Sequence, residues 1–511
     1  MKGVAAGSNR QAASGGNAAT DEAAITEELR ILEQQSRALE PSANERLTAR
    51  GVVVGYAEEF LDRIGDLKAF EEREASASTR GELEITEEAI GIGKAMEVVG
   101  EAVDGPGLNP ASGGHLGYIP GGGIYYSSLG DYAAAITNRY AGIYFASPGA
   151  VRMEHALVRW MAELAGYPAS AAGTLTSGGS LANLAAIVAA RDASGLAARD
   201  WHRAVIYSTE HAHHCLDKAY RIAGLGEAIM RRVPMDDCFR METTALDEMI
   251  RADERTGLRP LLVVASAGTT DTGAIDPLEN IAVIARSHKL WFHVDAAYGG
   301  FFLLTEEGRM KLAGIEQSDS VVMDPHKGLF LPYGLGAVMV REGRSLRQSH
   351  SYTAAYMQDA QAREAEDSPA NLSAELTRHF RGLRLWLPLK LHGLAPFRAC
   401  LREKLLLAKY VWQQLRQMPG FEVLNEPELS VVAFRYVPRH GDADGFNRRL
   451  QAAVQRDGRV FISSSRVRGQ YILRMAILSF RTHLETVQLA LRILHEAARA
   501  LEREDGAGRA T

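Results

Sequence analysis

The stretch Asp324-Pro325-His326-Lys327-Gly328 lies between the apolar run Ser320-Val321-Val322-Met323 and the turn-rich Leu331-Pro332-Tyr333-Gly334. A continuous apolar run of this kind predicts a buried strand, so Lys327 follows a strand end. A lysine held there can lose its proton and condense with an aldehyde. We therefore expect Lys327 to carry chemistry, although a lysine after a strand can also be an ordinary surface residue.

A carboxylate stands at the end of a second predicted strand. Phe292-His293-Val294-Asp295-Ala296-Ala297-Tyr298-Gly299-Gly300 begins as an apolar strand and ends in small residues, which places Asp295 at the strand's exit. Facing a pyridine nitrogen, such a carboxylate would keep the ring protonated. The ring could then accept the electrons released when a bond at a substrate's alpha carbon breaks.

A glycine-rich turn precedes a helix earlier in the chain, where Thr176-Ser177-Gly178-Gly179-Ser180 leads into the helical run 181–188. Glycines before a helix start leave N–H groups free to bind a phosphate, and the helix dipole favours its charge. Alone, Gly-Gly-Ser can be a simple loop and cap. Phosphate cradle, aspartate and lysine in this order are what a pyridoxal 5'-phosphate enzyme requires, so we expect that cofactor.

At these residues the chain resembles the group II pyridoxal phosphate-dependent amino-acid decarboxylases, most closely the aromatic-L-amino-acid type and its bacterial relatives. The resemblance extends from about Pro110 to about Glu496. It implies the α/β fold of fold type I, with a mainly parallel seven-stranded sheet, helices on both faces and a small α+β carboxy-terminal domain. It also implies a homodimer with the site at the subunit interface.

The resemblance assigns further residues, position by position. His213 falls where the family stacks a histidine on the cofactor ring, with His211 and His214 as bystanders. Tyr356 falls where it has a mobile-loop tyrosine, the expected proton donor to the alpha carbon, with Tyr352 as an alternative. With Lys327 and Asp295, His213 and Tyr356 complete the expected catalytic set. The expected cofactor-binding residues are Gly179, Ser180, His213, Thr270, Asp295, Ala297, His326 and Lys327.

The resemblance places the substrate-side wall at Tyr118, Ile119 and Pro120, in a segment rich in glycine and aromatic residues. Such a segment can also be a glycine-rich surface loop. Three positions depart from the animal aromatic decarboxylases: Gly328 replaces a tryptophan, Leu181 a glutamate, and Asp324 an asparagine. These departures leave the identity of the substrate open.

The expected reaction is decarboxylation of an L-amino acid, aromatic in the first instance, through a Schiff base at Lys327 and a quinonoid carbanion. A misplaced proton donor would let oxygen intercept the carbanion and give an aldehyde. The alternatives are a lyase of the sphingosine-phosphate type, a decarboxylase of non-aromatic amino acids, an aminotransferase and an inactive cofactor-binding protein. A metal site at His211 and His213 lacks a third ligand at a sensible spacing.

Composition limits the other classes of protein. The 511 residues carry a formal net charge of -6 and no basic stripe, which argues against nucleic acid as a partner. The 3 cysteines show no metal pattern and suit a reducing compartment. Neither a signal peptide nor an apolar run long enough for a membrane span is apparent, so we expect a cytoplasmic location.

Along the chain we expect five segments. They are a disordered tail (1–22), a helical segment that packs across the partner subunit (23–109), a large cofactor-binding domain (110–392), a small carboxy-terminal domain (393–502) and a tail (503–511). Buried strands are expected at 204–207, 261–265, 290–294, 320–323 and 337–340. Asp276 is expected to cap a helix that starts at Pro277. The polar stretch 343–377 is a candidate lid.

Overall fold

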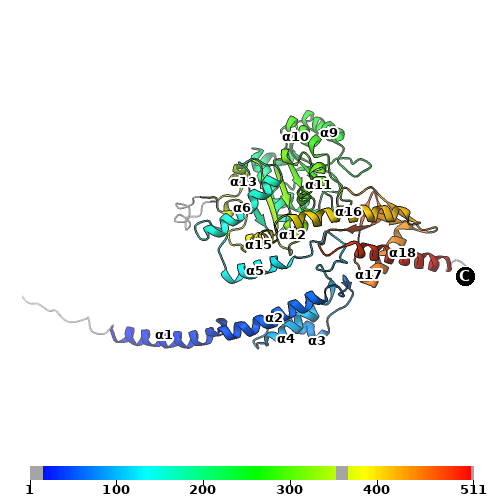
Figure 1. The fold of residues 1–511 in the computed structure, drawn as a ribbon. Helices are drawn as coiled ribbons and strands as arrows, with labels where there is room; N and C mark the ends of the chain where they lie inside the picture. The colour runs from blue at the N-terminus through cyan, green and yellow to red at the C-terminus, as the bar shows by residue number, and fades with distance from the viewer. Residues whose placement is uncertain (1–14, 353–365, 508–511) are drawn as a thin grey trace, which may run out of the picture. The chain divides into compact units, whose positions relative to one another are not determined.

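The computed structural model describes residues 15–352 and 366–507 (Figure 1). Its main sheet is seven-stranded, in the order β3-β9-β8-β7-β6-β4-β5. The bounds are β3 Ala172–Thr176, β4 Ala204–Ser208, β5 Ile229–Arg232, β6 Arg259–Ser266, β7 Trp291–Asp295, β8 Ser320–Met323 and β9 Gly336–Val340. Only β9 runs antiparallel to its neighbours within this sheet. The expected mainly parallel α/β sheet is confirmed.

Helices cover both faces of this sheet because its strands are apolar on both sides. One face packs on α7 Gly179–Ala193, α8 Cys215–Ile222 and α13 Gly343–His350. The other packs on α6 Pro148–Leu164, α9 Thr243–Arg255 and α10 Leu278–His288. Successive strand residues face opposite sides, so Phe292 and Val294 of β7 belong to the second core. The polar residues of β7 therefore lie on the α7 side.

A smaller antiparallel sheet forms the carboxy-terminal part, in the order β10-β11-β13-β12. Its strands are β10 Phe421–Val423, β11 Val431–Tyr436, β12 Ser463–Val467 and β13 Gln470–Ala476. Helices α16 Ala395–Gln417, α17 Ala443–Asp457 and α18 Leu484–Ala507 pack on it around a separate apolar core. This is the expected α+β element of the fold.

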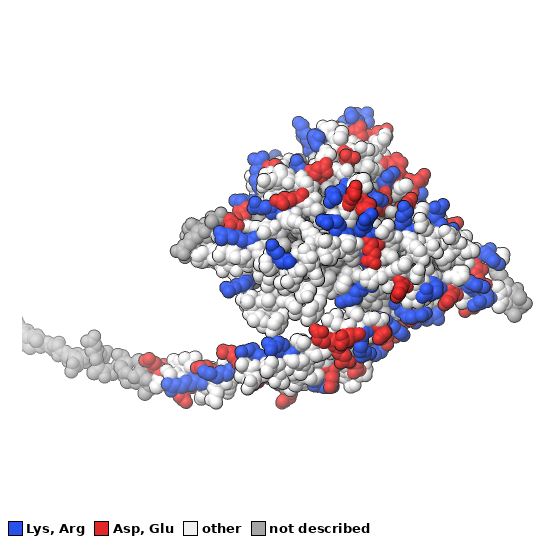
Figure 2. Space-filling view, in the orientation of Figure 1, with Lys and Arg blue, Asp and Glu red and all other residues white. Residues whose placement is uncertain are grey.

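The remaining elements are short or lie near the amino terminus. They are α1 Gly15–Ser36, α2 Ala43–Arg63, β1 Phe70–Glu71, α3 Ala77–Gly81, α4 Ile92–Val99, β2 Gly107–Leu108, α5 Tyr125–Thr137, α11 Glu306–Lys311, α12 Pro325–Gly328 and α15 Gly382–His392. Helix α1 thus begins before the predicted end of the disordered tail at residue 22. On the face shown in Figure 2, basic and acidic side chains are interspersed.

By compactness the chain divides into two units. One comprises Met1–Ile64 and Glu74–Gly105, and the other comprises Gly65–Arg73 and Pro106–Thr511. The second unit contains both the seven-stranded and the four-stranded sheet. The predicted boundary between residues 392 and 393 falls between α15 and α16 inside that unit, and it stays a prediction.

The expected cap of α10 is wrong. Helix α10 has Pro277 at its N-cap position, and no side chain caps it. Asp276 is buried instead, where its carboxylate accepts the N–H groups of Met241 and Ser266, each at 2.7 Å. Burial raises the pKa of Asp276 to about 6. Its role is to hold the end of β6 against a neighbouring loop.

Candidate active site

A cavity of about 350 Å³ opens where β4, β6, β7 and β8 end and α7 begins. Carboxyl ends of parallel strands meeting a helix start are the usual ligand site of such sheets. Every residue expected to bind the cofactor lines this cavity: Gly179, Ser180, His213, Thr270, Asp295, Ala297, His326 and Lys327. The fold therefore brings together residues that lie far apart in the sequence.

Lys327 lies on the short helix α12, whose first residue is Pro325. Its Nζ lies 3.0 Å from Oδ2 of Asp324, a carboxylate whose other oxygen is buried without a hydrogen-bond partner. Burial acts to lower the pKa of Lys327, but the carboxylates of Asp324 and Asp295 raise it, and the net direction is upward. The neighbouring carboxylates therefore favour the protonated amine, and the loss of its proton on reaction with an aldehyde stays a prediction.

Asp295 ends β7, half-buried in the cavity wall. Its Oδ1 accepts the N–H of Ala297 at 3.1 Å, and its Oδ2 accepts Nδ2–H of Asn183 at 3.1 Å. These two donors fix the orientation of the carboxylate. A carboxylate so held can keep a proton on a ring nitrogen that lies against it.

The start of α7 forms a tight cradle. Gly178 has φ +155°, which side chains rarely adopt, and a Cβ on Gly179 would lie 2.8 Å from Oδ2 of Asp324. A Cβ on Gly336 would lie 2.5 Å from the backbone carbon of Gly178. The glycines thus let the backbone close up at a helix start, where free N–H groups suit a phosphate.

Two histidines flank the lysine. His213 accepts the backbone N–H of Cys215 at Nδ1, 3.2 Å away, so its neutral ring carries the proton on Nε2. His326 donates from Nδ1 to the carbonyl of Leu335 at 2.5 Å. Burial lowers the pKa of both rings. Both are therefore neutral at pH 7 and can contact a ligand without adding charge.

The predicted substrate wall and proton donor stand apart from this cavity. Tyr118 is 56% exposed, and none of Tyr118, Ile119 and Pro120 is among the residues that line it. Tyr352 is 84% exposed. Tyr356 lies outside the described residues. The assignments of the substrate wall and of the proton donor stay predictions.

Asn183, Cys215 and Asp324 are among the lining residues that were not assigned a role from the sequence. Burial raises the pKa of the Cys215 thiol to about 12, so it is not a nucleophile at neutral pH. Asn183 is a single amide in the apolar run 181–188, and Asp324 directly precedes the lysine turn. A polar residue inside an apolar helix was the available signal for Asn183.

The donor set fits pyridoxal 5'-phosphate: a lysine for the aldehyde, an oriented carboxylate for the ring nitrogen, and a glycine-lined helix start for the phosphate. Fold and site together define a pyridoxal phosphate-dependent enzyme of fold type I.

Comparison with known proteins gives the family. The family described as "Pyridoxal-dependent decarboxylase conserved domain" matches residues 115–437. An aromatic-L-amino-acid decarboxylase of Bacillus atrophaeus is 31% identical over 384 residues, covering 74% of this chain and 80% of that protein. A phenylacetaldehyde synthase of Arabidopsis thaliana is 30% identical over 401 residues, covering 75% of this chain and 81% of that protein.

A solved structure of a similar protein has the same fold. The crystal structure of Oryza sativa TDC with PLP and tryptamine superposes with a TM-score of 0.85 at 25% identity, covering 90% of this chain and 99% of that chain. The chain belongs to the group II pyridoxal phosphate-dependent decarboxylases. It is an amino-acid decarboxylase, a carboxy-lyase that uses pyridoxal 5'-phosphate.

Within 15–352 and 366–507, no helix has the length and apolar character that a membrane crossing needs. Over the same ranges, no three His, Cys, Asp or Glu side chains are grouped as a metal ion would require.

Proposed function

We propose that this enzyme decarboxylates an aromatic L-amino acid to the amine and carbon dioxide, with Lys327 as the lysine that binds the cofactor. The observation that carries the proposal is the convergence of Lys327, Asp295 and His213 with the start of α7 around one cavity. The match to the pyridoxal-dependent decarboxylase family over residues 115–437 favours decarboxylation over the two alternatives, a lyase of the sphingosine-phosphate type and an aminotransferase.

Each side chain then has a separate task. Pyridoxal phosphate supplies an electron sink for the pair left behind when carbon dioxide departs. Lys327 would hold the cofactor through its aldehyde carbon, the position at which the substrate amine would then bind. Asp295 holds a proton on the ring nitrogen, and the N–H groups at the start of α7 bind the phosphate.

The remaining steps concern orientation and proton delivery. His213, neutral with its proton on Nε2, would pack on the face of the cofactor ring and orient the substrate carboxylate. His326 contacts the phosphate or the leaving group. Tyr356 returns a proton to the alpha carbon, which yields the amine rather than an aldehyde.

Support for an aromatic substrate comes from the relatives rather than from the lining of the cofactor cavity. Among the described residues that line this cavity, Lys327 is the only lysine, and no arginine is present. The predicted substrate wall lies outside it, where Arg474 donates to the carbonyl of Tyr118. The relatives named for aromatic amino acids support an aromatic ring at this place.

The test is product analysis. The holoenzyme is incubated in air with single L-amino acids, aromatic, branched aliphatic and acidic, and products are identified by mass spectrometry. We expect aromatic amines and carbon dioxide, with no product from the Lys327→Ala variant. Aldehyde with ammonia as the main product would refute Tyr356 as an effective donor. Turnover of glutamate but not of aromatic substrates would refute the substrate assignment.

We also propose that the enzyme is a homodimer whose subunits pack through the amino-terminal helices. Helix α1 exposes Ile25 (55%), Leu29 (60%) and Leu32 (51%) to solvent. Apolar side chains gathered on one helix favour burial against a second surface.

A cytoplasmic location is proposed as well, supported by three cysteines without disulfides, and cell fractionation tests it.

A further inference from the structure

Strand β7 places three polar side chains on one face of a buried sheet. Trp291, His293 and Asp295 alternate along the strand, so all three point toward α7. His293 is 1% exposed and pairs across the sheet with Ser320 of β8, which is 0% exposed. Polar groups buried in this way must be hydrogen-bonded to be tolerated.

These side chains form one continuous chain of hydrogen bonds. Trp291 Nε1 lies 2.8 Å from Ser320 Oγ, and Ser320 Oγ lies 2.8 Å from His293 Nδ1. His293 Nε2 lies 2.7 Å from Asn183 Oδ1, and Asn183 Nδ2 lies 3.1 Å from Asp295 Oδ2. The chain therefore ends on the carboxylate assigned to the cofactor's ring nitrogen.

Chemistry fixes the direction of every bond. The Asp295 carboxylate only accepts, so Asn183 donates with its amide and offers its oxygen to His293. Burial lowers the pKa of His293 to about 4, so the ring is neutral and donates from Nε2. Its Nδ1 then accepts the hydroxyl proton of Ser320, whose oxygen accepts the indole N–H. All four protons point toward Asp295.

We propose that Asn183, His293 and Ser320 are positioning residues that keep Asp295 charged and aimed at the cofactor's ring nitrogen. Aligned donors in a buried environment stabilise a negative charge more than isolated ones do. Asn183 acts directly, and His293 and Ser320 act through it. The inference rests on the role proposed above for Asp295.

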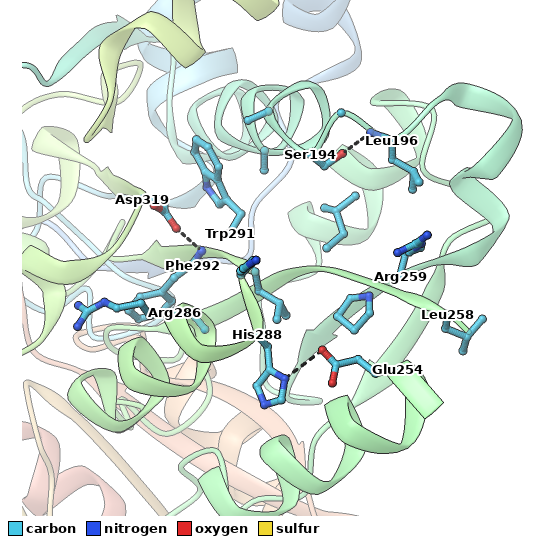
Figure 3. A pocket seen from close by; sticks show the side chains of 18 of the residues that line it. Ser194, Leu196, Glu254, Leu258, Arg259, Arg286, His288, Trp291, Phe292 and Asp319 are labelled. Carbon is cyan, nitrogen blue, oxygen red and sulfur yellow. Dashed lines mark hydrogen bonds and ion pairs between the residues drawn. The ribbon is translucent and has the colours of Figure 1, made fainter. Parts of the chain in front are cut away.

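The series of hydrogen bonds ends at Trp291, the first residue of β7, at the opposite end of that strand from Asp295. Trp291 lines a separate hollow of about 870 Å³, near Asp319 and Phe292 (Figure 3). In this hollow His288 pairs with Glu254, and Asp319 accepts the N–H of Phe292. Since Trp291 is the donor most remote from Asp295, its removal should have the smallest effect on the affinity for pyridoxal phosphate.

The test compares two cofactors that differ at one atom. Cofactor-free enzyme is titrated with pyridoxal 5'-phosphate and with its 1-deaza analogue, in which a carbon replaces the ring nitrogen. We expect Asn183→Ala and His293→Leu to weaken binding of pyridoxal phosphate roughly tenfold, as expected for lost hydrogen bonds to a charged group. Binding of the analogue should change by less than about threefold, because it has no nitrogen for Asp295 to meet.

Matched variants separate positioning from structure. His293→Gln keeps a donor toward Asn183 and should recover most of the affinity lost in His293→Leu. Ser320→Ala should cause a smaller loss of affinity, again for pyridoxal phosphate and not for the analogue. Ser318→Ala should cause none, because Ser318 is an equally buried serine that bonds Tyr167 and Ile315 instead.

Two results would overturn the inference in distinguishable ways. If Asp295→Asn weakens both cofactors equally, the proposed role of Asp295 itself fails. Asp295→Asn could instead weaken the binding of pyridoxal phosphate alone, while the Asn183 and His293 variants weaken the binding of both cofactors equally or of neither. In that case the role of Asp295 stands, and only the proposed role of Asn183, His293 and Ser320 is refuted. Should Asn183→Ala not fold, the Gln and Leu variants of His293 decide the matter.

Discussion

At the scale of single residues, the pair formed by Lys327 and Asp324 governs how the enzyme acquires its cofactor. The 3.0 Å contact between Nζ and Oδ2 stabilises the ammonium form, and the pKa of Lys327 is raised in consequence. Only the neutral amine attacks an aldehyde. The enzyme without cofactor thus holds its lysine in the unreactive form near neutral pH.

Replacing Asp324 with asparagine should speed cofactor capture. The substitution removes the negative charge that raises the pKa of Lys327, so more of the amine is neutral at pH 7.5. We expect the rate of pyridoxal phosphate binding to rise roughly tenfold. The midpoint of its pH dependence should move to lower pH. Stopped-flow absorbance from pH 6 to pH 10 measures both.

Asp319→Asn is the control, since Asp319 is a half-buried carboxylate that immediately precedes β8, the strand that Asp324 follows. It should leave the pH midpoint unchanged. A slower rate in Asp324→Asn, or an unmoved midpoint, would contradict the role given to Asp324.

At the scale of elements, the start of α7 is the most restrictive point of the site. Gly179→Ala would place a methyl group 2.8 Å from Asp324 Oδ2 and 3.3 Å from Ala297 Cβ. We expect affinity for pyridoxal phosphate to fall at least about tenfold, because the backbone around the phosphate must open by a fraction of an ångström. Equilibrium dialysis of the holoenzyme measures this loss.

Gly149→Ala is the control for that substitution. Gly149 also lies in the first turn of a helix, α6, but a Cβ there meets nothing within 4 Å. Its affinity should match that of the unaltered enzyme. Equal losses in both variants would mean that the start of α7 has no special part in binding phosphate.

Sequence patterns predicted the central elements and missed those at the edges. Strands β4, β6, β7, β8 and β9 are short, near-continuous apolar runs, the pattern of strands that are covered on both faces. Strand β5 lies at the sheet edge, is only half-buried and ends in two arginines, so it carries no such run. Strand β3, also at an edge, reads Ala-Gly-Thr-Leu-Thr, too small and polar to stand out.

The same contrast holds within the site. Motif residues such as Lys327 and Asp295 follow recognisable strand ends, and the predicted cofactor set was found around one cavity. Asn183 could not be assigned, because its function depends on a contact across 110 residues of sequence with His293. A local sequence pattern does not indicate which buried side chains, far apart in the sequence, contact each other in the fold.

At the scale of the whole molecule, the amino-terminal helices carry the prediction about assembly. Changing Ile25, Leu29 and Leu32 together to aspartate should raise the dimer dissociation constant at least roughly a hundredfold, because apolar contacts at a subunit interface would become buried charges. Sedimentation velocity over a range of concentrations measures the dissociation constant.

The control changes Ile222 and Val283 to aspartate, which are 63% and 61% exposed in the unit that holds the main sheet. This variant should sediment as the unaltered enzyme does. An unchanged dimer in the triple variant, or a monomer in both, would rule out α1 as the specific packing surface.

The backbone between residues 113 and 124 ties two distant parts of the enzyme to each other. Leu116 bonds to the carboxy-terminal sheet region through Phe461 and Ala476. Gly121 packs so closely on His326 that a Cβ would lie 2.1 Å from its carbonyl oxygen, and Ile124 donates to Phe330. Movement of the four-stranded sheet would therefore displace helix α12, which carries Lys327. Thermal loosening of that sheet and escape of the cofactor should therefore occur as a single event.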